Sequence, residues 1–83
     1  MKVLYFAWLR TKAGTASEEV TPPGEVGTVA ELMDWLARRH PGFAEAMAAP
    51  GVIRAAVNHD YAEPDHPVAP GDEIAFFPPV TGG

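Results

Sequence analysis

The sequence predicts an α+β domain in which a mixed sheet of four or five strands carries one main helix on one face. Three observations predict this fold class. The chain has 83 residues, enough for one domain with a single small core. Short β-branched or aromatic runs alternate with turns rich in proline and glycine. A single long segment, starting at Thr28, has helical periodicity.

Two strands are expected before that helix. Residues 3–9 form an unbroken apolar and aromatic run, which predicts the first strand. Residues 17–21 predict a weaker second strand that ends at the prolines and glycine of 22–24. The turn at 12–15 would join the two as a hairpin.

The helix begins with a capping box, because Thr28 is followed by Glu31. Residues 38–40 place cations at the negative end of the helix dipole, and Pro41 with Gly42 ends the helix. Residues 43–49 predict a short second helix. The apolar positions that recur on one face of the main helix are Val29, Leu32, Met33, Leu36 and Ala37.

The remaining strands follow the second helix. Residues 52–58 predict a third strand, followed by a turn at 58–60. Residues 61–68 contain two prolines and predict a loop, with a short edge strand near 61–62. A turn at 70–72 leads into the last strand, residues 73–77, which Pro78 and Pro79 end because proline cannot donate to a ladder.

The order of elements indicates how they pack. A helix between a first hairpin and a later pair of strands packs across one face of a mixed sheet. The first and last strands then lie side by side and parallel in its middle, which is the β-grasp, or ubiquitin-like, arrangement. We expect residues 1–79 to form this domain and residues 80–83 to form a flexible tail.

Composition limits the possible functions. The chain has no cysteine, which excludes a disulfide scaffold, a thiolate metal site and a cysteine nucleophile. Its three histidines lie at unrelated spacings, so no metal site and no bound cofactor are expected. A net charge of −5 argues against nucleic acid and is compatible with a basic protein partner. No apolar run is long enough to span a membrane, and a cytoplasmic location is expected.

The final residues have a pattern that suits chemistry rather than packing. Gly82 and Gly83 add no side chain to a core and have the largest backbone entropy. A carboxylate on such a segment can enter the narrow active site of another protein and be activated there. Gly83 gives an unhindered carbonyl, and Gly82 lets the backbone pass where a Cβ would clash.

The segment 65–83 closely resembles the end of the small subunit of molybdopterin synthase, the MoaD family, above all in its ending Phe-Phe-Pro-Pro-Val-Thr-Gly-Gly. Residues 2–7 and 56–58 also fit that family. The resemblance implies a ubiquitin-like sulfur carrier whose Gly83 is adenylated by a MoeB-like adenylyltransferase that uses ATP and magnesium. A sulfur donor then converts Gly83 to a thiocarboxylate.

The same resemblance implies a MoaE-like large subunit as the main partner, in a heterotetramer. That subunit would receive the tail and transfer the sulfur to cyclic pyranopterin monophosphate, building the dithiolene of molybdopterin. The chain itself shows no acid–base pair, phosphate loop or catalytic triad. The catalytic residues are therefore expected on the partners.

The docking surface follows from period-two counting along the central strands. One side of the sheet is covered by the helix, so an apolar and aromatic side remains for a partner, unless the loop at 61–68 folds over it. The residues expected to bind the partner are Phe6, Trp8, Phe77, Pro78, Pro79, Val80 and Thr81.

Three alternatives remain open from the sequence. A ThiS-like carrier of thiazole synthesis would use the same chemistry for another pathway. A ubiquitin-like modifier would be ligated to lysines through Gly83. A plain β-grasp interaction module would have an inert tail.

Overall fold

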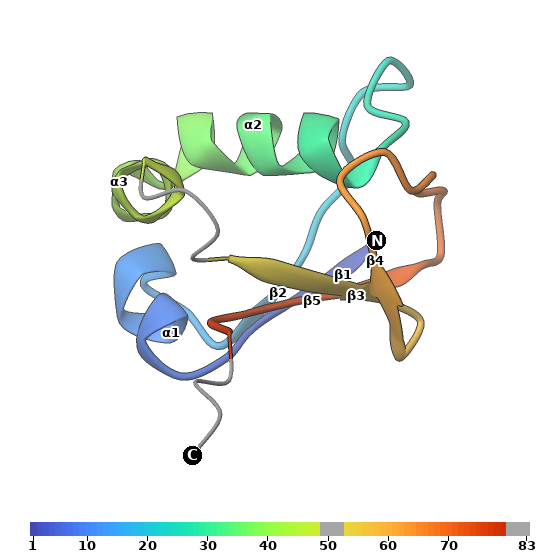
Figure 1. The fold of residues 1–83 in the computed structure, drawn as a ribbon. Coiled ribbons are helices and arrows are strands. Elements are labelled where there is room, and N and C mark those ends of the chain that lie inside the picture. The colour runs from blue at the N-terminus through green and yellow to red at the C-terminus, as the bar shows by residue number, and fades with distance from the viewer. Residues whose placement is uncertain (49–52, 80–83) are drawn as a thin grey trace.

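The computed structural model describes residues 1–48 and 53–79 and contains a five-stranded sheet under a layer of helices (Figure 1). The strands are β1 (Lys2–Tyr5), β2 (Ser17–Glu19), β3 (Arg54–Val57), β4 (Asp60–Ala62) and β5 (Glu73–Phe77). The helices are α1 (Trp8–Ala13), α2 (Val29–Arg39) and α3 (Pro41–Met47). The predicted α+β, β-grasp fold class is therefore confirmed.

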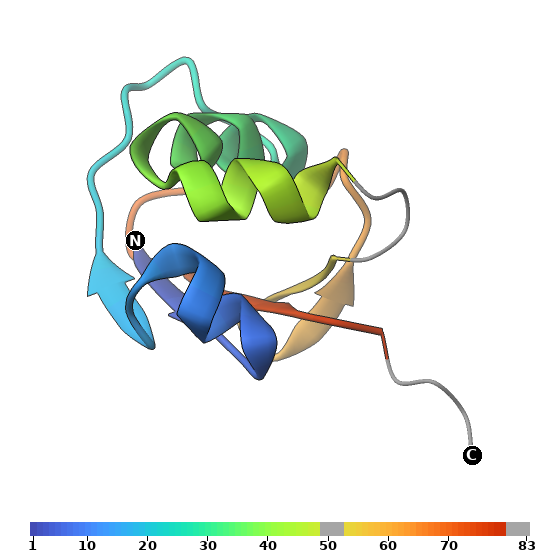
Figure 2. The same cartoon turned by 90° about the vertical axis from the view of Figure 1, so that its left-hand side faces the viewer.

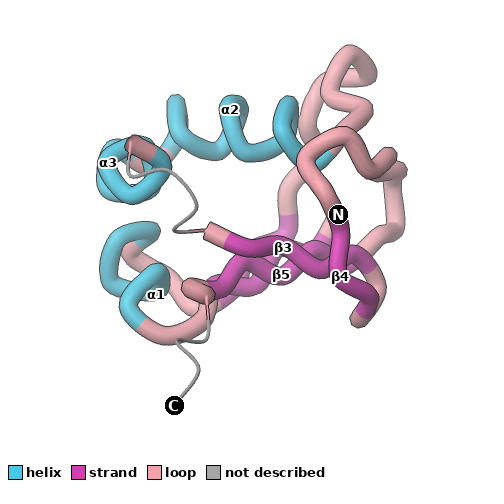
Figure 3. The backbone as a smooth tube through the Cα atoms, viewed as in Figure 1, coloured by secondary structure: helices cyan, strands magenta, loops and turns pink. Residues whose placement is uncertain are grey.

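The strand order is β2-β1-β5-β3-β4, so the first and last strands form the middle of the sheet. Figure 3 shows the strands in magenta, with the cyan helix α2 on one side of them. They run parallel, with Val3 opposite Ile74 and Tyr5 opposite Phe76. The other three pairings are antiparallel. The predicted central pair is confirmed, and the bounds of β5 are those that the sequence predicts.

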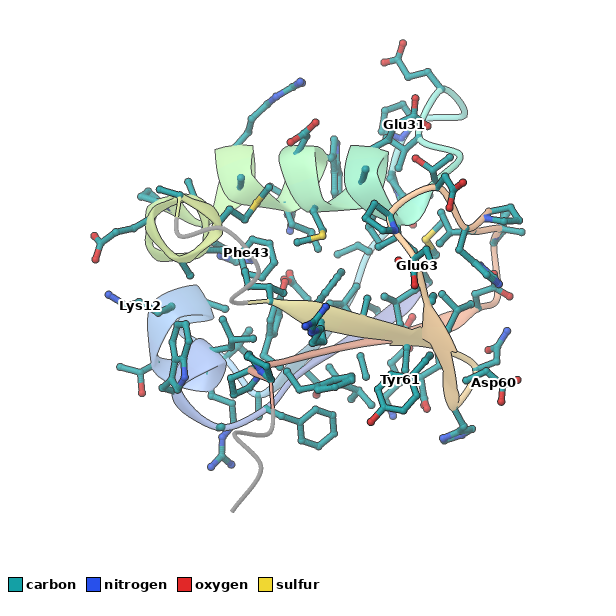
Figure 4. The ribbon with its side chains drawn as sticks, viewed as in Figure 1. Lys12, Glu31, Phe43, Asp60, Tyr61 and Glu63 are labelled. Atoms are coloured by element: carbon teal, nitrogen blue, oxygen red, sulfur yellow. The ribbon has the colours of Figure 1, made fainter. Side chains whose placement is uncertain are left out.

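The core lies between the sheet and the layer formed by α2 and α3 (Figure 1). Alternate residues of β1 and β5 point into it, and Leu32 and Leu36 of α2 are fully buried against them. Tyr5, Phe43 and Phe76 form an aromatic cluster with ring centroids 5.4–6.3 Å apart. Figure 4 shows Phe43 between α3 and the sheet, where it joins the two layers.

The first turn of α2 has the predicted capping interaction. The Glu31 amide donates to the Thr28 hydroxyl at 3.2 Å. The Glu31 carboxylate accepts from the Gly27 amide at 2.9 Å, one residue before the position used in the usual capping box. The Thr28 side chain therefore satisfies one of the backbone donors that the helix leaves free, and the Glu31 side chain satisfies the amide of the residue before the cap.

The prediction of one strand over residues 3–9 is wrong after Tyr5. Ala7 has a φ of 55°, a left-handed conformation that ends the strand, and α1 begins at Trp8. Leu9 and Ala13, one helical turn apart, are the buried residues of α1. The connection from β1 to β2 is thus a short helix, capped by Gly14 with φ 81°, and not the predicted hairpin turn.

Other boundaries differ by a few residues. β2 is shorter than the predicted 17–21. β3 covers Arg54–Val57 of the predicted 52–58. Residues 49–52 lie outside the described part of the chain. Pro41 ends α2 as predicted but also occupies the first turn of α3, where its fixed φ and missing N–H are tolerated. The edge strand near 61–62 is confirmed as β4.

The carboxylate of Glu18 connects β2 to the end of α2. Tyr5 donates to Glu18 at 2.7 Å, His40 Nε2 lies 2.6 Å from the same carboxylate, and Arg39 lies 3.4 Å away. Burial raises the pKa of Glu18, but the hydrogen bonds from Tyr5 and His40 lower it, and the net pKa lies below the usual value. Burial and the bond to Glu18 raise the pKa of the Tyr5 hydroxyl far above its usual range.

The helices α1 and α3 meet at Gly42, which predicts a steric effect of substitution. A Cβ there would lie 2.1 Å from the Lys12 carbonyl oxygen. We expect Gly42→Ala to lower the free energy of unfolding by about 1–3 kcal/mol, as overpacking does, when measured by urea denaturation. The control Gly24→Ala meets no atom within 4 Å and should change it by less than about 0.5 kcal/mol. Equal effects would contradict the close approach.

The low pKa of Glu18 predicts a pH dependence of stability. A carboxylate with a lowered folded pKa stabilises the protein above its unfolded pKa, and this contribution is lost as pH falls through the folded pKa. We expect Glu18→Gln to cost about 1–2 kcal/mol at pH 7, and the difference from wild type to shrink below pH 4.5. Denaturation at several pH values measures this difference. The exposed neighbour Glu19, substituted by Gln, serves as the control, and a constant difference for Glu18→Gln would contradict the account.

Candidate functional site

One face of the sheet is free of the helical layer and has an apolar centre. The β register aligns Leu4, Ala75, Ala56 and Tyr61 in one row across four strands. Tyr61 is 80% exposed, and Figure 4 shows its ring on the side of the sheet away from α2. Since none of the described helices covers this row, we call it, together with Phe6 and Phe77, the open face.

Within the segment 61–68, Tyr61 belongs to β4 and lies on the open face, but the loop at 63–68 does not cover that face. It runs instead along the start of α2, where Ala30 donates to Pro64 at 2.8 Å and Val29 donates to His66 at 2.9 Å. Val68 donates to Gly27 at 3.0 Å and is buried in the core. The loop thus belongs to the helical side of the sheet and leaves the aromatic side chains accessible.

The open face meets the exit of the last strand at one end of the sheet. Because β1 and β5 are parallel neighbours, the residues that follow both strands emerge together. The Phe6 amide donates to the Phe76 carbonyl at 3.0 Å, which holds the two exits side by side. Figure 2 shows α1, which starts at Trp8, at this end.

The predicted partner-binding residues divide into two groups. Phe6 and Trp8 are 47% and 42% exposed, and Phe77, Pro78 and Pro79 are partly exposed beyond the end of the core. The structure brings these five residues to the same end of the sheet. The predicted residues Val80, Thr81, Gly82 and Gly83 lie outside the described residues.

Sequence reasoning did not include Tyr61 in the site. Its ring packs edge-on against Phe77, with centroids 5.7 Å apart. The signal was present, because an aromatic residue two positions after the turn at Asn58 and His59 falls on the same face as Ala56. The prolines of the following loop obscured it, since they made this segment read as irregular.

The side chains of the open face are suited to binding another protein. The described ones are mostly apolar or aromatic; the polar ones are Ser17 opposite Leu4, the cations Lys2 and Arg54, and Glu19 and Glu73 opposite Lys2. Within residues 1–48 and 53–79, no group of three metal-ligating side chains lies close enough to hold an ion. In the same ranges, no helix has the length and apolarity required to cross a membrane.

At the start of β5, a hydrogen-bond network around Asn58 and Asp72 fixes the turn that precedes the strand. Asn58 donates to Asp72 at 3.0 Å and accepts from the Glu73 amide at 3.0 Å. The hydrogen bonds from Asn58 and from the Ala69 amide lower the pKa of Asp72. Gly71, with φ 91°, occupies a conformation that favours glycine. These contacts set the start of β5 and thereby the place where the strand ends.

Comparison with known proteins agrees with this geometry. The ThiS family model matches residues 3–83. The molybdopterin synthase sulfur carrier subunit of Escherichia coli is 43% identical over 83 residues, covering 100% of this chain and 99% of that protein.

Two solved structures share the fold over nearly the whole chain. A putative molybdopterin converting factor, subunit 1, from Pyrococcus furiosus is 35% identical, with a TM-score of 0.80 and coverage of 95% of both chains. SAMP1 from Haloferax volcanii is 31% identical, with a TM-score of 0.82 and coverage of 99% of this chain and 97% of that one. The chain therefore belongs to the ThiS family, and its resemblance to the sulfur carrier subunits of molybdopterin synthase is confirmed over its full length.

Proposed function

We propose that this chain is the sulfur carrier of a molybdopterin synthase. The observation that carries the proposal is the convergence of the open face with the end of β5 at Phe77, six residues before Gly83. A partner that docks on this face is positioned to receive the final residues. The 43% identity to the Escherichia coli sulfur carrier subunit supports molybdopterin synthesis over other pathways.

The proposed chemistry takes place at the carboxylate of Gly83. A free carboxylate is a poor electrophile, so a MoeB-like adenylyltransferase joins it to the AMP part of ATP, with magnesium, and pyrophosphate leaves. Sulfur at the sulfide level from a donor then attacks the acyl carbon and displaces AMP, which gives a thiocarboxylate without net oxidation or reduction. The thiocarboxylate sulfur is a soft nucleophile and ionises at neutral pH.

The transfer itself would occur in the active site of a MoaE-like large subunit. The thiocarboxylate sulfur bonds to a carbon of cyclic pyranopterin monophosphate as a carbon–oxygen bond at that carbon breaks, and water then cleaves the resulting thioester. Two such transfers in turn supply the two sulfurs of the dithiolene. The carboxylate of Gly83 is thereby regenerated and the sulfur stays on the pterin. The acids, bases and substrate-binding groups for these steps are proposed to lie on the partners.

Docking energy would come mainly from the aromatic side chains of the open face. Burying an aromatic ring of 150–250 Å² at about 25 cal/mol per Å² contributes several kcal/mol. Pro78 and Pro79 restrict the backbone just before the last residues. This restriction lowers the entropy that is lost when a partner captures the segment.

A ubiquitin-like modifier is the second candidate, supported by the 31% identity to SAMP1, because SAMP is described as a small archaeal modifier protein. It would share the adenylation step but form an amide with a lysine of another protein. Isopeptide-linked conjugates in cells would therefore favour it, and a thiocarboxylate consumed by a large subunit would favour the carrier. A ThiS-like carrier for another pathway would load sulfur and bind a different large subunit.

The proposal predicts a specific mass change after incubation with ATP, magnesium, the cognate adenylyltransferase and a sulfide source. Cleavage after Glu73 releases residues 74–83, which contain no methionine or tryptophan whose oxidation could mimic a gain of sulfur. We expect this peptide to gain the mass of sulfur in place of oxygen and to react with an alkylating reagent. A chain lacking Gly82 and Gly83 should fold equally well and gain nothing. No gain in the wild type, with an enzyme active on a control carrier, would contradict the proposal.

The two adjacent phenylalanines of β5 provide a matched test of docking. Phe76 is fully buried, so Phe76→Ala should lower the free energy of unfolding by about 3–5 kcal/mol. Phe77 lies on the open face, so Phe77→Ala should cost about 1 kcal/mol but weaken binding to the large subunit by at least about tenfold. Calorimetric titration and urea denaturation measure the two quantities. Unchanged binding by the folded Phe77→Ala variant would count against docking through this face.

A further inference from the structure

A hollow of about 380 Å³ lies beside the end of β5, at the edge of the open face. It is distinguished from the rest of that face by its mixture of apolar and polar groups. Its lining residues are Arg54, Ala55, Tyr61, Glu63, Phe77 and Pro79. Phe77 lies directly opposite Arg54 in the β3–β5 register and packs against Tyr61, so a cation and a phenol both neighbour its ring.

Two hydrogen-bond donors in this hollow have no partner among the described residues. The exposed guanidinium of Arg54 takes part in none of the hydrogen bonds or ion pairs found there, although Glu63 lines the same hollow. The Tyr61 hydroxyl, on a side chain 80% exposed, is likewise unused in the described part of the chain. A planar cation with five N–H donors beside aromatic rings suits a carboxylate that arrives on an apolar segment.

The position of the hollow relative to Gly83 limits what can cover it. Pro79 is part of its wall and precedes Gly83 by four residues. Four residues span at most about 14 Å when fully extended, at 3.3–3.6 Å per residue. Any protein that encloses the carboxylate of Gly83 in an active site therefore has its surface close to Arg54.

The other cation of the open face lies in a different electrostatic setting. Lys2 is at the opposite end of the central strands, with Glu19 and Glu73 as its register partners on either side. Two glutamates therefore flank Lys2 in the sheet, although the Glu73 carboxylate lies 3.4 Å from His59 Nε2. In a chain of net charge −5, Arg54 is thus the cation of the described strands that a docking partner meets next to the exit of β5. Arg10 lies at the same end but on α1.

We propose that the hollow selects the large subunit by binding a carboxylate of that subunit, carried on an apolar segment that covers Phe77, through Arg54 and Tyr61. This inference rests on the proposed function, because it assumes that a large subunit docks on the open face. The inference goes further because it assigns partner specificity to Arg54, which is not one of the aromatic residues of the open face. It also states the charge of the group that the partner contributes.

The test compares charge changes at the two ends of the same face. Affinity for the large subunit of the chain's own molybdopterin synthase is measured by calorimetry at low and high salt for Arg54→Glu, Arg54→Met and Lys2→Glu. We expect both Arg54 variants to bind more weakly, Arg54→Glu by at least about tenfold at low salt, and Lys2→Glu by less than about threefold. Glu63→Gln should leave the affinity unchanged or raise it. Thermal melting verifies that each variant is folded.

The outcomes separate the inference from the function on which it rests. If wild type binds and Arg54→Glu and Arg54→Met bind equally well, or if Lys2→Glu is as harmful as Arg54→Glu, the inference is overturned and the proposed function stands. Weaker binding by Glu63→Gln would show that the partner presents a cation, and this too would overturn the inference. If wild type neither binds the large subunit nor acquires sulfur, the proposed function fails together with the inference.

Discussion

The parallel pairing of β1 with β5 is the constraint on which the rest of the structure depends. Each strand places alternate residues, Val3 and Tyr5 or Ile74 and Phe76, in one core beneath α2 and α3. A shift of one residue would move these side chains to the other face of the sheet, so the register is held by burial. The hydrogen-bond network around Asn58 and Asp72 fixes the start of β5. Because the two strands are parallel neighbours, their carboxyl ends lie at the same edge of the sheet. The residues after Phe77 leave the sheet at that edge.

This arrangement separates stability from recognition within single strands. Phe76 contributes to the aromatic cluster that joins the layers, whereas Phe77, the next residue, faces away from them beside Tyr61. Substitutions on the open face can therefore alter partner choice at little cost to folding. Gly42 connects the two functions, because its close approach to α1 sets the position of the helix that starts at Trp8. A family that serves several partners can vary one face of the sheet while the other stays packed.

Much of the fold could be predicted because its signals are local. The capping residues and apolar spacing of α2 and the turn and prolines around β5 each specify one conformation. The helix α1 could not be predicted in the same way. Its apolar residues continue those of β1, and the break occurs at Ala7, a residue type that gives no warning of a positive φ. The burial of Leu9 depends on α3, which lies far along the sequence.

The candidate site shows the same division between local and long-range information. Phe77 could be assigned from alternation and from the neighbouring glycine tail, as could Phe6 just beyond β1, whereas Trp8 reaches the same end through α1 and not through the predicted strand. Tyr61 and Arg54 join them only through pairing of β3 and β4 with the central strands. Residues contributed by long-range pairing have no sequence motif of their own. The resemblance to sulfur carriers is the source of the proposed chemistry at Gly83, and the structure adds the surface at the end of β5.

The central claim is that a partner docks on the open face and not on the helical layer. The chain has two tryptophans, Trp8 at the end of the open face and Trp35 on α2, whose ring lies 4.9 Å from the Arg39 guanidinium. An NMR titration of the ¹⁵N-labelled chain with the large subunit would follow both indole N–H signals. A shift of the Trp8 signal, with Trp35 unchanged, is the predicted result. A shift of Trp35 with Trp8 unchanged would place the partner on the helices and contradict the account.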